Sequence, residues 1–168
     1  MTTIYQKTLV EPIHFEGVGL HSGKKSKMTI LPSKEDQGIV FKRVDLKENN
    51  IIEANFTNVT SAKLCTTLEN KYGNKVSTVE HLLAALYFAD LDNVVIEINC
   101  DEIPIMDGSA KNFLETFKKS KIKSLSKKRK YLKVLNKIEL EDGKRKISIE
   151  PDNQSLEIEF QLNYMNNI

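Results

Sequence analysis

Short apolar runs separated by turn residues dominate the first 75 residues of the chain. KMTIL ends just before Pro32, GIVFKRV begins at Gly38 and IIEANFTNV begins at Ile51. Each run is rich in β-branched or aromatic residues, which is typical of strands. A later run that begins at Asn93, NVVIEINC, alternates well enough to predict another strand.

Two segments have patterns typical of helices. The first covers about 78–89 and is almost wholly apolar from Leu82 onward. The second covers about 110–119, where Ser109 suits the N-cap position. Four of its residues recur at the i, i+3, i+4, i+7 spacing of one apolar helix face: Ala110, Phe113, Leu114 and Phe117.

The remaining third of the chain predicts strands again. YLKVLNKIELEDGKRKISIEP is typical of a hairpin that turns at Asp142 and Gly143, and LEIEFQLNY predicts a third strand at 156–164. The order of strands and helices favours the α+β class.

A charge shift near Phe117 suggests a domain boundary. Residues 1–117 carry 12 Lys and Arg against 16 Asp and Glu, whereas residues 118–168 carry 13 against 7. Nine basic and no acidic residues lie in 118–133, a composition that could neutralise phosphates. Because Tyr131 is its single aromatic residue, the segment has no platform for base stacking. We interpret it as a solvated connection between domains and expect no nucleic-acid partner.

Composition indicates an ordinary water-soluble protein. The 168 residues are 40% hydrophobic and 29% charged, with a net charge of +2. The N-terminus has no signal-peptide pattern, and no run approaches the ~18 apolar residues of a transmembrane helix. Cys65 and Cys100 form neither a CxxC pair nor a disulfide framework. We therefore expect a cytoplasmic protein.

Glu80 and His81 stand at the start of the first predicted helix, ahead of its apolar run. STVE matches a capping box, in which Ser77 is the N-cap and Glu80 reaches back to the backbone. Taken alone, the residue types favour this structural role over chemistry. A chelating helix usually supplies two zinc ligands one turn apart, but Ala84 and Ala85 occupy the positions after His81. The chain thus has at most one recognisable zinc ligand.

Five motifs in order, however, resemble the zinc-dependent UDP-3-O-acyl-N-acetylglucosamine deacetylases of lipid A biosynthesis. They are QKTLVEPIHFEGVGLHSG at 6–23, GIVFKR at 38–43, TSAKLCTTL at 60–68, VSTVEHLLAAL at 76–86 and EIPIMDGSA at 102–110. The resemblance implies an α+β fold of two similar domains, each a two-layer sandwich of sheet and helices. It assigns 1–120 to the first domain, 121–130 to a basic linker and 131–168 to the opening strands of the second.

The resemblance also implies roles for individual residues. His81 would ligate one Zn²⁺ and Glu80 would be the general base of amide hydrolysis. His21, Leu64, Cys65 and Asp107 would contact the UDP-linked acylated glucosamine, although Asp107 also suits a turn.

In that family the two other zinc ligands belong to an HKxxD-type motif of the second domain, and a later histidine is the general acid. Neither is present in this sequence. We therefore expect an N-terminal portion that lacks its C-terminal domain and is inactive alone. A non-enzymatic module that binds RNA or anionic lipid is the alternative.

Overall fold

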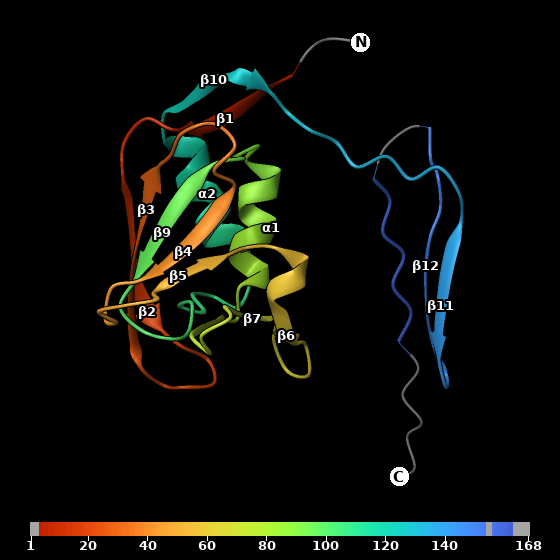
Figure 1. Ribbon diagram of the computed structural model, residues 1–168, viewed down its shortest axis with the longest axis horizontal. Coiled ribbons are helices and arrows are strands. Elements are labelled where there is room, and N and C mark those ends of the chain that lie inside the picture. The colour runs from red at the N-terminus through yellow and green to blue at the C-terminus, as the bar shows by residue number, and fades with distance from the viewer. Residues whose placement is uncertain (1–3, 154–155, 163–168) are drawn as a thin grey trace. The chain divides into compact units, whose positions relative to one another are not determined.

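The computed structural model describes residues 4–153 and 156–162 (Figure 1). Its helices are α1 (Glu80–Phe88), α2 (Lys111–Lys119) and the short 3₁₀ turn η1 (Phe56–Asn58). Its strands are β1 (Tyr5–Leu9), β2 (Ile13–Val18), β3 (Lys25–Pro32), β4 (Ile39–Arg43), β5 (Ile51–Glu53), β6 (Val59–Ser61), β7 (Thr67–Glu69), β8 (Lys75–Ser77), β9 (Val94–Ile98), β10 (Ile122–Lys128), β11 (Ile138–Asp142) and β12 (Arg145–Ile149). The α+β class is confirmed.

A five-stranded sheet with the order β2-β3-β9-β4-β5 forms one layer of the compact unit that ends at Arg129. The central strand β9 runs antiparallel to β3 and parallel to β4. Side chains of a strand alternate between the two faces of the sheet. Val94, Ile96 and Ile98 accordingly share one face and are fully buried, so the strand predicted from NVVIEINC is confirmed.

The two helices form the second layer and pack together against this sheet (Figure 1). Phe113 and Phe117 of α2 are fully buried and meet the ring of Phe15 on β2 edge to face, with ring centroids 5.0 and 6.1 Å apart. Edge-to-face pairs add stability beyond the area that they bury. The apolar face predicted for α2 is therefore confirmed.

Only one side of α1 enters the core. Leu82, Ala85 and Leu86 are fully buried, but Tyr87 and Phe88 at its end are 63% and 69% exposed. A helix packed against one layer buries only one face. Because nearly all residues of this helix are apolar, its sequence did not indicate which face is buried.

The segment 121–130, interpreted above as a basic linker, is mostly a strand. β10 pairs antiparallel with β1 from Leu9↔Ile122 to Tyr5↔Lys128. A register shift, in which Ser124 to Lys128 of β10 face Lys7 to Tyr5 of β1, and the many exposed lysines obscured the strand pattern, because a bulge breaks the alternation of faces. Lys127 of this strand forms an ion pair with Asp36.

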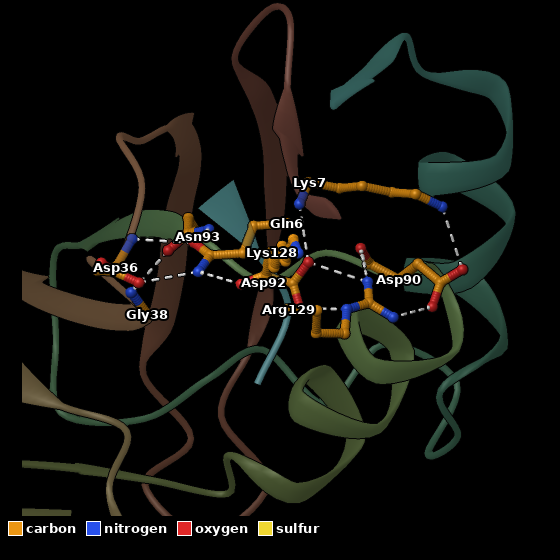
Figure 2. Close-up of polar contacts among 9 residues, drawn as sticks. All are labelled: Gln6, Lys7, Asp36, Gly38, Asp90, Asp92, Asn93, Lys128 and Arg129. Carbon is orange, nitrogen blue, oxygen red and sulfur yellow. Dashed lines mark hydrogen bonds and ion pairs between the residues drawn. The ribbon is translucent and has the colours of Figure 1, made fainter. Parts of the chain in front are cut away.

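Arg129 fastens the end of β10 to the turn after α1 (Figure 2). Its Nη1 donates to Asp90 Oδ1 at 2.7 Å, and its Nη2 donates to the Asp90 carbonyl and to Asp92 Oδ2, both at 2.9 Å. Asp92 Oδ2 also accepts the Lys7 backbone N–H at 2.7 Å. The hydrogen bond from Arg129 is the main cause of a lowered pKa at Asp90. The end of β10 and strand β1 are therefore both bonded to the turn after α1.

A neighbouring buried network joins β1 to the β3–β4 loop (Figure 2). Gln6 Nε2 donates to Asp36 Oδ1 at 2.8 Å and to the Lys128 carbonyl at 3.2 Å. Asn93 Nδ2 donates to Gln6 Oε1 at 2.9 Å, while Asn93 Oδ1 accepts the Gly38 N–H. Because buried amides are costly without partners, this network favours a single register for β1 and β10.

The chain divides into two compact units, one ending at Arg129 and the other beginning at Lys130. The second unit contains the hairpin β11–β12, whose register pairs Asp142 with Arg145, so the predicted hairpin is confirmed. The third strand predicted at 156–164 is not formed over 156–162, the part of it that the structure describes. The equivalence of the units to the family's domains remains a prediction.

Replacing Arg129 by methionine is expected to lower the free energy of unfolding by about 1–3 kcal/mol, because Asp90 and Asp92 both lose the hydrogen bonds of its guanidinium. Arg129 is only 16% exposed. Lys24→Met is the matched control. The Lys24 side chain is 58% exposed, and its ion pair with Asp101 is expected to contribute at most about 1 kcal/mol to the free energy of unfolding. Urea unfolding followed by circular dichroism measures both, and equal losses would contradict the assignment.

Limited trypsin digestion should cut after Lys130 or Lys133 before it cuts after Lys123 or Lys127. The first two sites follow the last residue of the first unit, whereas the other two lie in a paired strand. A protease needs locally unfolded backbone, and strand pairing opposes its formation. Mass spectrometry of the first fragments distinguishes the sites, and early cleavage within β10 would show that this strand is not stably formed.

Candidate active site

Glu80 and His81 occupy the first turn of α1, where both are half-buried. Glu80 Oε2 accepts the Thr66 backbone N–H at 3.0 Å. This bond joins the start of the helix to the loop between β6 and β7. The carboxylate therefore has one oxygen oriented by the backbone of a neighbouring segment.

The capping box predicted from STVE is not formed. Ser77 belongs to β8 and its Oγ donates to the Asp101 carbonyl at 3.0 Å, while Val79 occupies the N-cap position without a side-chain cap. The physical reason is the backbone of Thr78, whose φ of +58° moves the start of the helix two residues beyond the expected cap. Glu80 is consequently free to bind the Thr66 segment instead of its own helix end.

Thr78 is a strained link between β8 and α1. Left-handed backbone is rare for a β-branched residue and costs roughly 1–3 kcal/mol. The residue is 2% exposed, and its Oγ1 donates to Glu102 Oε1 at 3.0 Å. The strained backbone therefore lies two residues before Glu80, and the hydrogen bond to Glu102 stabilises this conformation.

Glu102 is the residue that sequence analysis missed. It opens the EIPIMDGSA motif, and its side chain is 1% exposed. Oε1 also accepts the His21 backbone N–H at 2.9 Å, and Oε2 accepts that of Ser22 at 2.7 Å. Burial alone would raise the pKa of Glu102, but the hydrogen bonds from His21, Ser22 and Thr78 outweigh it and the pKa is lowered. An anionic carboxylate is thus stable here, although nothing in its local sequence indicates burial.

An open pocket of about 440 Å³ lies beside these segments. It brings together three of the predicted substrate-contact residues, His21, Leu64 and Cys65. Its other lining residues are Ser22, Ser61, Lys63, Thr67, Lys75, Ser77, Asp101 and Glu102. Glu80 and His81 do not line it, but Glu80 is hydrogen-bonded to Thr66, which lies between two lining residues.

Asp107 is exposed and lies in a turn before α2, outside the residues that line the pocket. Its Oδ1 accepts both the N–H of Ser109, at 3.1 Å, and its hydroxyl, at 2.9 Å. The hydrogen bond from the Ser109 side chain is the main cause of a lowered pKa at Asp107. Ser109 Oγ in turn accepts the Lys111 N–H at 3.1 Å. The observed contacts of Asp107 are therefore those of a turn that begins a helix.

No cluster of three or more His, Cys, Asp or Glu side chains suited to a metal occurs among the residues that the structure describes. None of the helices in this part of the chain could span a membrane.

Comparison with known proteins identifies the family. Residues 6–168 match the family described as "LpxC: UDP-3-O-acyl N-acetylglycosamine deacetylase". The UDP-3-O-acyl-N-acetylglucosamine deacetylase of Geotalea uraniireducens (strain Rf4) is 46% identical over 147 residues, which are 88% of this chain and 48% of that protein. Proteins with the same name from Shewanella frigidimarina (strain NCIMB 400) and Geobacter sp. (strain M21) are 38% and 41% identical over 161 residues, 96% of this chain and 52% of each relative.

The chain therefore belongs to the UDP-3-O-acyl N-acetylglycosamine deacetylase family. It spans about half the length of the curated relatives that it matches.

Stability at acid pH tests the charge of Glu102. A carboxyl group whose folded-state pKa is lowered contributes stability above its unfolded-state pKa, and this contribution is lost as the pH falls through the folded-state value. We expect the free energy of unfolding to fall more steeply below about pH 4.5 in the wild type than in Glu102→Gln. Glu16→Gln, which alters an exposed ion pair with Lys27, should keep the wild-type slope. Parallel acid profiles for the wild type and Glu102→Gln would contradict the assignment.

Proposed function

We propose that this chain provides part of the active site of a zinc-dependent hydrolase. The enzyme removes the N-acetyl group from UDP-3-O-acyl-N-acetylglucosamine in lipid A biosynthesis, in the cytoplasm. The observation that carries the proposal is the identity of 38–46% to deacetylases over 88–96% of the chain. The placement of Glu80 and His81 on the first turn of a packed helix supports it.

We assign one zinc ligand to His81. An imidazole nitrogen is a common zinc ligand, and the half-buried first turn of α1 gives the ring limited freedom. A catalytic zinc needs three protein ligands, and the described residues contain no cluster of that size. The proposal therefore places the other ligands, and the general acid, outside the described residues. When bound, zinc supplies Lewis acidity that polarises the amide carbonyl and acidifies water.

Glu80 is assigned as the general base. Its Oε2 is occupied by the Thr66 N–H, which orients the carboxylate. Oε1 is the atom that we assign to take a proton from the attacking water, while the general acid would protonate the leaving amine and Oε1 would then release its proton to solvent. General-base catalysis requires this kind of fixed geometry, because the proton must move within hydrogen-bond reach.

The pocket beside this pair is assigned to the substrate. His21 and Ser22 present a polar edge, while Leu64 supplies an apolar surface that is 80% exposed and Cys65 is half-buried. A substrate with a polar nucleotide and an acyl chain needs both kinds of surface. We keep Asp107 as a predicted substrate contact, even though its observed hydrogen bonds are those of the turn before α2.

The roles of Glu80 and His81 are tested in an enzyme of the relatives' full length. Glu80→Gln is expected to keep about one zinc per molecule and to lower kcat by about 10²–10⁴, the usual contribution of a positioned general base. His81→Ala is expected to lose both zinc and activity, since it removes a ligand. Deacetylation of the UDP-linked substrate, metal content and melting temperature are measured together.

Glu115→Gln is the matched control, because Glu115 is an exposed carboxylate on α2. It should leave turnover and zinc unchanged. Near-normal turnover by Glu80→Gln would refute its role as the base, and a wild-type enzyme that binds zinc but leaves the N-acetyl group intact would refute the proposed reaction.

A further inference from the structure

Glu102 connects two segments that carry predicted site residues and lie far apart in the sequence. Its carboxylate accepts the backbone N–H groups of His21 and Ser22, and the hydroxyl of Thr78. The first two residues belong to the loop that follows β2, and Thr78 lies two residues before Glu80. One buried group therefore determines the separation of the loop from the start of α1.

The backbone around Glu102 is fixed as well. Ser77 and Glu102 form a parallel β-bridge, with the Ser77 N–H donating to the Asp101 carbonyl at 2.9 Å. The Ile103 N–H donates to the Ser77 carbonyl at 3.1 Å. The backbone neighbours of Glu102, Asp101 and Ile103, are thus both hydrogen-bonded to Ser77. With its backbone held in this way, the Glu102 side chain has little freedom to follow a displaced loop.

The loop approaches the carboxylate too closely for a side chain at Gly19. A Cβ placed on Gly19 would lie 2.4 Å from Glu102 Oε2 and 2.8 Å from its Cδ. It would also lie 2.4 Å from Ser22 Oγ. The requirement for glycine here is steric and arises from the positions of the Glu102 carboxylate and the Ser22 hydroxyl.

The start of α1 depends on contacts with other segments of the chain. The helix has no side-chain cap, and the residue before its N-cap has φ +58°. Such backbone persists only where surrounding contacts enforce it. Glu102 supplies the hydrogen bond to Thr78 Oγ1 in this turn.

We propose that Glu102 is a positioning residue for the catalytic pair, which holds the first turn of α1 and the His21 loop in a fixed mutual arrangement. It acts through these two segments and is not assigned a contact with the reacting atoms. The inference rests on the proposed deacetylation. It extends that function by naming the group that aligns Glu80 and His81 with the loop at the pocket.

Glu102→Gln tests the proposal in an enzyme of the relatives' full length. Glutamine has nearly the same size, but whichever way its amide is turned, an NH₂ faces a donor of His21 or Ser22. We expect kcat to fall about 10–100-fold, because an error of about 1 Å in a catalytic group costs up to 10²-fold. Zinc content should stay near one per molecule. In the 168-residue chain, hydrogen exchange of the His21 and Ser22 amides should accelerate about tenfold or more.

Gly19→Ala provides an independent approach, since its Cβ would force the loop and the Glu102 carboxylate apart without changing the chemistry of the carboxylate. We expect the same loss of kcat. The double variant Gly19→Ala/Glu102→Gln should lose less than the product of the two single effects, because both changes disrupt one contact.

Two controls separate positioning from stability. Glu97→Gln makes the same chemical change at a half-buried ion pair with Lys42, and Ile52→Val removes a buried methyl group from β5. Both should keep kcat within about twofold at a temperature where all variants are folded. If Glu102→Gln keeps wild-type kcat while its melting temperature falls, Glu102 is only structural and the proposal is overturned. An inactive wild-type enzyme would overturn the proposed function, and this inference with it.

Discussion

The hydrogen bonds of one buried carboxylate determine how the chain passes from β8 into α1. Glu102 accepts donors from His21, Ser22 and Thr78, and the last of these residues adopts left-handed backbone. Without such a partner, a β-branched residue would favour extended or right-handed backbone. The first residue of the helix would then change, and the Glu80 side chain would point in a different direction relative to the Thr66 loop.

The layered core gives this arrangement its rigidity. Leu82, Ala85 and Leu86 attach α1 to the sheet, and the aromatic contacts of α2 with β2 complete the same apolar layer. A polar pair at the end of a helix whose inner face is buried has a well-defined position with limited motion. Residues that must be placed accurately benefit from such a support, because elements packed into a core hold geometry better than loops do.

Ion pairs of Arg129 hold the C-terminal end of the first unit in place. Arg129 joins β10 to the turn after α1 through Asp90 and Asp92, and this turn is the far end of the helix that begins with Glu80. A basic run that the sequence presented as a connection therefore ends in a specific ion-pair network. Its lysines are mostly exposed, whereas the side chain of Arg129, just after β10, is largely buried. Arginine suits this role because its planar guanidinium can bind two carboxylates at once.

The sequence by itself determined the α+β class, the strand at 94–98, the apolar face of α2 and the hairpin at Asp142–Gly143, because each depends on local periodicity or turn chemistry. Ordered motifs also determined the family resemblance. The pairing of β10 with β1 was not predictable, because a register shift and exposed lysines hide the strand pattern.

The prediction of a capping box was wrong for a similar reason. A local motif cannot show that Thr78 takes a positive φ through a bond to Glu102, 24 residues away. Burial of Glu102 and the convergence of His21, Leu64 and Cys65 on one pocket depend on long-range contacts. Only the tertiary structure decided them, since the free energy of a buried carboxylate depends on donors that folding brings from distant segments.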